Sequence, residues 1–202
     1  MKISGLWSGL DYKTPNADFQ ILKSCYKLHS KFFIDLGQLR RLFLHKCDFS
    51  DVTSDSLKSL VNLEVLGISK PSNCSHIQVD ILNKLKYLEL SFQLSIFQNR
   101  LSNENLEILK FEVDPCSAID RVGQIEILKK WNLPNLKALK LETNFETFNL
   151  DWLSGMPNLR NLEMYLYHMH TFSYGNQANK IELMTLSGNF TLKSLVENPS
   201  KL

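Results

Sequence analysis

One spacing of leucines recurs along this chain and limits the folds open to it. With a leucine as position 1, apolar residues return at positions 4 and 6, and the best copy reads Leu-Arg-Arg-Leu-Phe-Leu-His-Lys-Cys over residues 39–47. Six further copies begin at residues 63, 85, 106, 136, 159 and 181. Their starts lie 24, 22, 21, 30, 23 and 22 residues apart, which is typical of one structural unit repeated along a chain.

The spacing inside each copy predicts a β-strand. Side chains two residues apart on a strand point to the same face, so positions 4 and 6 line one face and positions 3, 5 and 7 the other. One such strand cannot bury its apolar face alone, and we therefore expect the seven strands to stack into a parallel sheet over one continuous core. Apolar residues at helical spacing between the strands, such as Leu57 and Leu60, predict short helices or helical turns.

The filled positions resemble the leucine-rich repeat family over about residues 36 to 192. This resemblance implies an α/β solenoid with a curved parallel sheet on its concave side and short helices or helical turns on its convex side. The uneven repeat lengths are similar to those of nucleotide-binding immune receptors and of F-box adaptors. The ninth position, an Asn or Cys in the family, is kept at Cys47, Asn144 and Asn189 but is Pro71, Gln93, Asp114 and Tyr167 elsewhere. We therefore expect irregular turns after those strands.

Residues 1–35 fit the spacing poorly, and we expect an N-terminal cap or a decayed repeat there, before an array of about seven repeats over residues 36–202. Two interpretations stay open. Phe19, Leu22 and Ser24 fit positions 1, 4 and 6 of a decayed repeat. Alternatively, residues 19–36 form a capping helix with one apolar stripe.

Composition excludes several classes of function. The chain has 23 basic and 21 acidic residues, a net charge of +2, which gives no general attraction to nucleic acid or to an anionic membrane. No segment approaches the roughly 18 apolar residues of a membrane span. The four cysteines form no Cys-x-x-Cys pair, which favours a reducing compartment, and we expect a cytoplasmic protein without a cofactor. Position 2 alternates in charge between most neighbouring copies, which predicts ion pairs between strands.

Side chains that could carry chemistry are few. His168 and His170 have the spacing of metal ligands on a strand but have no third ligand nearby in sequence, so we expect no metal. His45 and Cys47 could form a base and a nucleophile, although Cys47 fills the structural ninth position. We therefore expect that the protein is not an enzyme. The alternative is a regulator of an enzyme, such as a GTPase activator, for which Arg100 is the candidate arginine.

The remaining candidate is the outer face of the sheet, which we expect to bind another protein. Positions 3, 5, 7 and 8 should be exposed there, including Thr143 and Leu166 at position 8. Aromatic residues and arginine commonly dominate binding energy at protein interfaces. The candidate partner-binding residues are Arg41, Phe43, Tyr87, Phe92, Lys110, Glu163 and Tyr165. The identity of the partner and the oligomeric state stay open.

Overall fold

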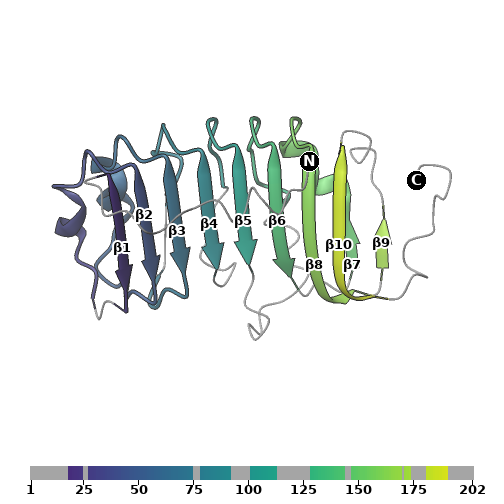
Figure 1. Ribbon diagram of the computed structural model, residues 1–202, viewed down its shortest axis with the longest axis horizontal. Helices are drawn as coiled ribbons and strands as arrows, with labels where there is room; N and C mark the ends of the chain where they lie inside the picture. Colours follow the sequence, from purple (N-terminus) through teal and green to yellow (C-terminus); the bar gives the residue numbers. More distant parts are fainter. Residues whose placement is uncertain are drawn as a thin grey trace.

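The computed structural model is a solenoid whose repeats each contribute one strand to a single parallel sheet (Figure 1). It describes residues 18–24, 27–74, 78–91, 101–112, 128–143, 147–169, 171–173 and 181–190. The sheet has eight strands in chain order, and every neighbouring pair is parallel. The strands are β1 (Phe19–Lys23), β2 (Arg41–His45), β3 (Val65–Ser69), β4 (Tyr87–Ser91), β5 (Ile108–Glu112), β6 (Ala138–Thr143), β8 (Asn161–Met169) and β10 (Leu183–Phe190).

The register of the sheet is the register of the sequence repeat. Position 4 of each copy lies opposite position 4 of the next, as Leu42 does opposite Leu66. At each step the backbone N–H groups of positions 2 and 3 both donate to the position 2 carbonyl of the preceding repeat, as those of Glu64 and Val65 do to Arg40. Leucines at positions 1, 4 and 6 from β2 to β6 are buried in one core. The predicted α/β solenoid is therefore confirmed.

Helical turns cover the inner face of the sheet. Within the described residues they are the 3-10 helices η1 (Ser30–Phe33), η2 (Ser54–Ser59) and η4 (Leu150–Gly155). The helical turn that the spacing of Leu57 and Leu60 predicted is present as η2, and both side chains are buried beneath the sheet. Within the described residues, no helix is long and apolar enough to cross a membrane.

The first strand lies where the sequence was ambiguous. Phe19–Lys23 pairs with β2 as strand β1, so the interpretation of a capping helix starting at Phe19 is wrong. The decayed repeat is also shifted by two residues from its expected frame, because Leu22 lies opposite Leu44 at position 6. Gln20 occupies position 4, where the other repeats have leucine or methionine, and this explains why the leucine spacing did not reveal the frame of this strand. Phe19 and Ile21 consequently lie on the outer face.

The strands end in two different ways. In β1, β2 and β3 the residue after the strand adopts a left-handed conformation, with φ of 55° at Ser24, 53° at Lys46 and 50° at Lys70. This turns the chain out of the sheet and leaves both lysines exposed. In β6 and β8 the strand continues instead, so Thr143 and Leu166 alternate inward and are fully buried. The prediction that position 8 is exposed is therefore wrong for these two residues.

A second, two-stranded parallel sheet lies at the β10 end of the solenoid (Figure 1). It pairs β7 (Thr147–Asn149) with β9 (Thr171–Ser173). The turn expected after Leu166 is replaced by the continuation of β8 to Met169. The leucine spacing predicted neither feature. The small sheet lies outside positions 1 to 9 of the repeats, and the continuation of β8 takes the place of the turn expected there.

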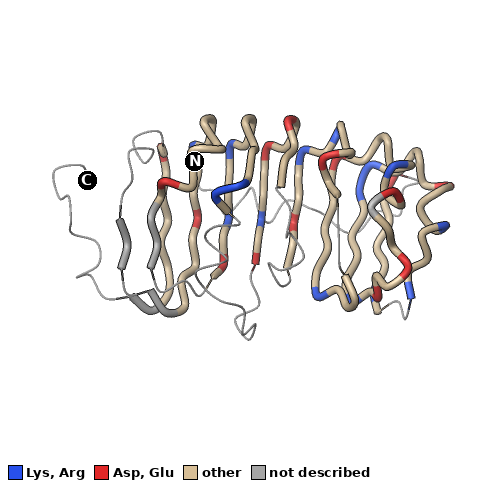
Figure 2. Tube along the Cα trace, turned by 180° about the vertical axis from the view of Figure 1, so that it is seen from behind, with Lys and Arg blue, Asp and Glu red and all other residues tan. Residues whose placement is uncertain are grey.

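The charged residues at position 2 form the expected ion pairs along the edge where the strands begin. Figure 2 shows acidic and basic residues alternating over most of this edge. The pairs are Arg40–Glu64 at 3.9 Å, Lys137–Glu107 at 2.7 Å and Arg160–Glu182 at 3.5 Å. Such exposed pairs contribute little each, roughly 0 to 1 kcal/mol, but opposite charges favour this alignment of neighbouring strands.

Asparagines just before position 1 form a second alignment device. The side-chain amide of Asn62 donates to the Gly37 carbonyl of the preceding repeat at 2.8 Å, and Asn158 does the same to Pro134. Asn135 repeats the contact with Glu104 at 2.6 Å. Each amide satisfies a backbone carbonyl in the turn of the neighbouring repeat, which ties successive turns together.

Candidate functional site

The outer sheet face is formed by positions 3, 5 and 7 of strands β1 to β6 and β8, and we call this surface the exposed sheet face. Side chains at these positions are mostly half-buried, because neighbouring strands hold them side by side. The face divides into a hollow near β1 to β3 and a charged region from β4 to β8.

The hollow lies around Gly67, the glycine at position 5 of β3. Its cavity volume is about 450 Å³. Phe43 leans across Gly67 from β2, and a Cβ on Gly67 would lie 2.3 Å from the Phe43 Cδ1 atom. Gly67 therefore allows this position of the ring. The hollow is lined by Ile21, Lys23, Phe43, Leu44, His45, Gly67, Ile68, Ser69 and Glu89.

Contacts on β1 and β2 support the Phe43 side of the hollow. The rings of Phe19 and Phe43 meet edge to face, with centroids 6.1 Å apart. The Arg41 guanidinium lies 5.2 Å above the Phe19 ring and 3.4 Å from the Asp18 carboxylate. This chain of contacts holds the aromatic side chains in place.

Glu89 borders the hollow on β4 and is held by two neighbours. Lys110 Nζ donates to Glu89 Oε1 at 2.8 Å, and the Tyr87 hydroxyl donates to Glu89 Oε2 at 3.0 Å. Tyr87 itself is only 8% exposed. The sequence proposed Tyr87 as an exposed contact residue, but its register places it between Val65 and Ile108, which flank it on the neighbouring strands. Its visible role is to orient Glu89.

A second ion-pair network lies on β6 and β8. Lys140 Nζ is 2.9 Å from Glu163 Oε1 and 3.5 Å from Glu142 Oε1. Burial opposes the charged ammonium, but the hydrogen bond and charge of Glu163, followed by those of Glu142, outweigh it and raise the pKa of Lys140. The ammonium is therefore a fixed positive charge at neutral pH.

Acidic side chains at the ends of β5 and β6 meet aromatic side chains of the middle and second half of β8. Glu112 lies opposite Glu142 in the register, and Glu142 lies opposite Tyr165. Tyr165 is 40% exposed and its ring meets that of Tyr167 at a centroid distance of 4.8 Å. Burial, followed by the negative charge of Glu142 and smaller electrostatic contributions from Tyr165 and Glu112, raises the pKa of Tyr167. We call these four residues the acidic aromatic patch.

Apart from the buried Tyr87, the predicted contact residues that the structure describes fall into three groups. Phe43 borders the hollow, and Arg41 supports it through Phe19 and Asp18. Lys110 and Glu163 lie on the face but are engaged with Glu89 and Lys140. Tyr165 is exposed as predicted. Phe92 lies outside the described residues, as does Arg100.

The residues weighed for chemistry have structural surroundings where they are described. The Cys47 thiol is buried and donates to the carbonyls of His45 at 3.6 Å and Leu22 at 3.9 Å, which fits a role in the turn. His45 Nδ1 lies 2.5 Å from Ser69 Oγ, but no carboxylate is hydrogen-bonded to this imidazole in the described part of the chain. Burial raises the pKa of the Cys74 thiol to about 12, so it stays protonated at neutral pH.

Metal binding finds no support among the described residues, which contain no group of three or more His, Cys, Asp or Glu side chains that could hold an ion. The side chain of His168 and all of His170 lie outside the described residues.

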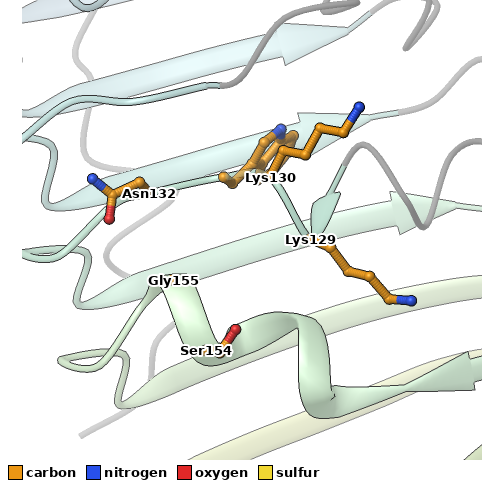
Figure 3. A pocket seen from close by; sticks show the side chains of 6 residues that line it. Lys129, Lys130, Asn132, Ser154 and Gly155 are labelled. Carbon is orange, nitrogen blue, oxygen red and sulfur yellow. The ribbon is translucent and has the colours of Figure 1, made fainter.

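A further hollow of about 450 Å³ lies on the connecting segments, between Trp131 and η4 (Figure 3). The exposed side chains of Lys129 and Lys130 extend in different directions beside it. A Cβ on Gly155 would lie 1.9 Å from the Trp131 carbonyl oxygen, so this glycine permits close backbone packing between the two segments. The arrangement is explained by packing.

Sequence reasoning missed several residues of the exposed sheet face. Ile21 and Lys23 were missed because β1 has no leucine at position 4. Gly67 has a visible signal, since it is the one glycine at position 5 from β2 to β8. Tyr167 was assigned to a turn at the ninth position, whereas the extended β8 places it beside Tyr165.

Comparison of the chain with protein-family models and with curated proteins finds no match to either.

Proposed function

We propose that this chain is a non-catalytic leucine-rich repeat module that recognises another protein through the exposed sheet face. The observation that carries the proposal is the hollow at Gly67, which is supported by fixed aromatic contacts on one side and by the fixed carboxylate of Glu89 on the other. A surface whose side chains are already ordered loses less entropy when it binds. Half-buried aromatic side chains beside a hollow are also typical of binding surfaces on proteins.

We propose further that the module belongs to the irregular, cytoplasmic class of such repeats. The uneven repeat lengths and the two kinds of strand ending support this assignment. The sequence resemblance to immune receptors and F-box adaptors points the same way.

An affinity capture from native cell extract tests the function. The parent chain is compared with a variant carrying Phe43→Ala and Tyr165→Ala, which removes one aromatic side chain from each part of the face. The matched control carries Ile34→Ser and Val61→Ser, which removes two exposed apolar side chains outside the sheet. All three proteins are first checked for equal folding by circular dichroism.

We expect at least one protein to be captured by the parent and the control but reduced several-fold with the face variant. Equal capture by all three proteins would contradict the proposal, as would a loss confined to the Ile34→Ser and Val61→Ser control.

A further inference from the structure

The charges on the exposed sheet face are unevenly distributed. From β4 to β8, positions 3, 5 and 7 carry four glutamates and two lysines. Both lysines lean outward along the face, Lys110 toward Glu89 at 2.8 Å and Lys140 toward Glu163 at 2.9 Å. Negative charge therefore remains at the centre of this region, at the ends of β5 and β6.

Glu112 is the clearest part of this excess. It lies directly opposite Glu142 on the neighbouring strand, an arrangement that destabilises a sheet. Glu142 lies 3.5 Å from Lys140, whereas Glu112 has no ion pair or hydrogen bond to its side chain among the described residues. Stability of the fold does not explain this pair of like charges.

The surroundings of the two carboxylates favour a cation from outside the chain. Tyr165 lies opposite Glu142, is exposed, and packs edge to face against Tyr167. An aromatic ring next to carboxylates attracts an ammonium or a guanidinium both through the ring face and through charge. A partner's lysine or arginine is the side chain with this chemistry.

The hollow at Gly67 gives a second, independent contact on the same face. It lies on β3, and the acidic aromatic patch begins two strands away on β5. Glu112 lies two strands and Glu142 three strands from Gly67, and both lie two residues further along their strands. With strands about 4.8 Å apart and about 3.3 Å per residue, the separations are roughly 12 and 16 Å. An extended chain covers these distances in about four residues.

We propose that the exposed sheet face binds an extended segment of a partner protein that places an apolar side chain in the Gly67 hollow and, about four residues away, a lysine or arginine on the acidic aromatic patch. This inference rests on the proposed function and adds the chemistry of the partner. The segment crosses the strands, passing over Glu89 and Lys110, whose charges already neutralise each other.

A displayed library of random 12-residue peptides tests the proposal. The library is selected separately against the full chain and against the variants Glu112→Gln, Phe43→Ala and Glu182→Gln. Glu182→Gln is the matched control, because it removes one exposed glutamate at the strand-start edge, away from the patch. Thermal melting confirms that each variant is folded.

We expect the parent to enrich peptides with an apolar residue and, about four residues away, a lysine or arginine. Glu112→Gln should lower the enrichment of the basic residue at least threefold while keeping the apolar one, and Glu182→Gln should change neither. Phe43→Ala should lower the enrichment of the apolar residue.

Two results would overturn the inference in distinguishable ways. In the first, the enriched peptides depend on Phe43 but show no preference for a basic residue, or show the same preference with Glu112→Gln. This result would contradict binding of a basic residue at the patch but would still support binding through the exposed sheet face. A selection that enriches no peptide dependent on Phe43 or Glu112 would contradict both this inference and the proposed function.

Discussion

The repeats at the two ends of the solenoid have the same leucine spacing, but their strands end differently. At β1 to β3 the residue at position 8 takes a left-handed conformation, the strand stops after five residues, and Cys47 lies buried in the turn. At β6 and β8 position 8 stays extended, and the strand is longer. Position 8 is Ser or Lys at the first end, and Thr143 or Leu166 at the second.

The difference shows how one residue position changes the outer surface. Positive φ is costly for β-branched and bulky residues, so Thr and Leu favour the extended form and are buried by alternation. The longer β8 then carries Tyr167 onto the same face as Tyr165. The short strands provide the hollow, and the long ones provide the aromatic part of the patch.

The largest expected effect comes from a substitution in the core that both ends of the solenoid share. Leu109→Asp places an unpaired charge at a fully buried position in the middle of the core, and we expect it to unfold both ends in one transition. The measurement is thermal melting by circular dichroism. Leu183→Asp is the control, since Leu183 is exposed at position 3 of β10 and should melt like the parent. A Leu109→Asp variant with the parental melting temperature would contradict the assigned register.

A smaller effect should be specific to the long strand ending. Leu166→Ala removes a buried side chain and should lower the free energy of unfolding by about 2 to 5 kcal/mol. The same truncation at the equivalent position of β2, Lys46→Ala, removes only an exposed chain and should change it by less than about 0.5 kcal/mol. Urea denaturation measures both values. Equal losses in the two variants would mean that position 8 is buried at both ends.

Glycine at position 8 should act in opposite directions at the two ends. Lys46→Gly relieves a left-handed conformation and should raise the free energy of unfolding by about 0.5 to 1 kcal/mol. Thr143→Gly removes a buried β-branched residue from an extended strand and should lower it by about 1 kcal/mol. Parallel urea titrations compare the signs. Two shifts of the same sign would refute the two kinds of ending.

The smallest expected effect is the difference in stability between removing the charge of a glutamate in an ion pair and removing that of a glutamate outside one. Glu107→Gln breaks the 2.7 Å ion pair with Lys137 and should lower the free energy of unfolding by a few tenths of a kcal/mol. Glu112→Gln relieves the repulsion with Glu142 and should leave it unchanged or raise it by a similar amount. The difference should shrink in 1 M salt, because screening weakens both interactions. A clear loss for Glu112→Gln would indicate a stabilising partner inside the chain.

The sequence predicted the features that depend on a repeated apolar pattern. The sheet register and the helical turn near Leu57 and Leu60 follow from that pattern. The ion pairs of Arg40 and Glu107 follow from the charges at position 2 once the register is set. It failed where one residue decides a local conformation. Gln20 at position 4 left the frame of the first strand undecided. Thr143 and Leu166 were expected on the exposed face with the other residues at position 8, but β6 and β8 continue through that position.

The candidate site was only partly predictable for a related reason. Phe43 and Tyr165 follow from alternation along a strand. The burial of Tyr87 and the hollow at Gly67 depend instead on which side chains neighbour them across strands, and this requires all the registers at once. The uncompensated charge of Glu112 can likewise be recognised only once the ion pairs of Lys110 and Lys140 are known.

The most direct test of the central claim is photo-cross-linking in native extract, with p-benzoylphenylalanine in place of Tyr165 on the exposed sheet face or in place of Val61 in a turn. We predict protein adducts from position 165, none from position 61, and loss of the former when Phe43→Ala is added. Adducts that form equally from position 61, or that persist with Phe43→Ala, would contradict recognition through the exposed sheet face.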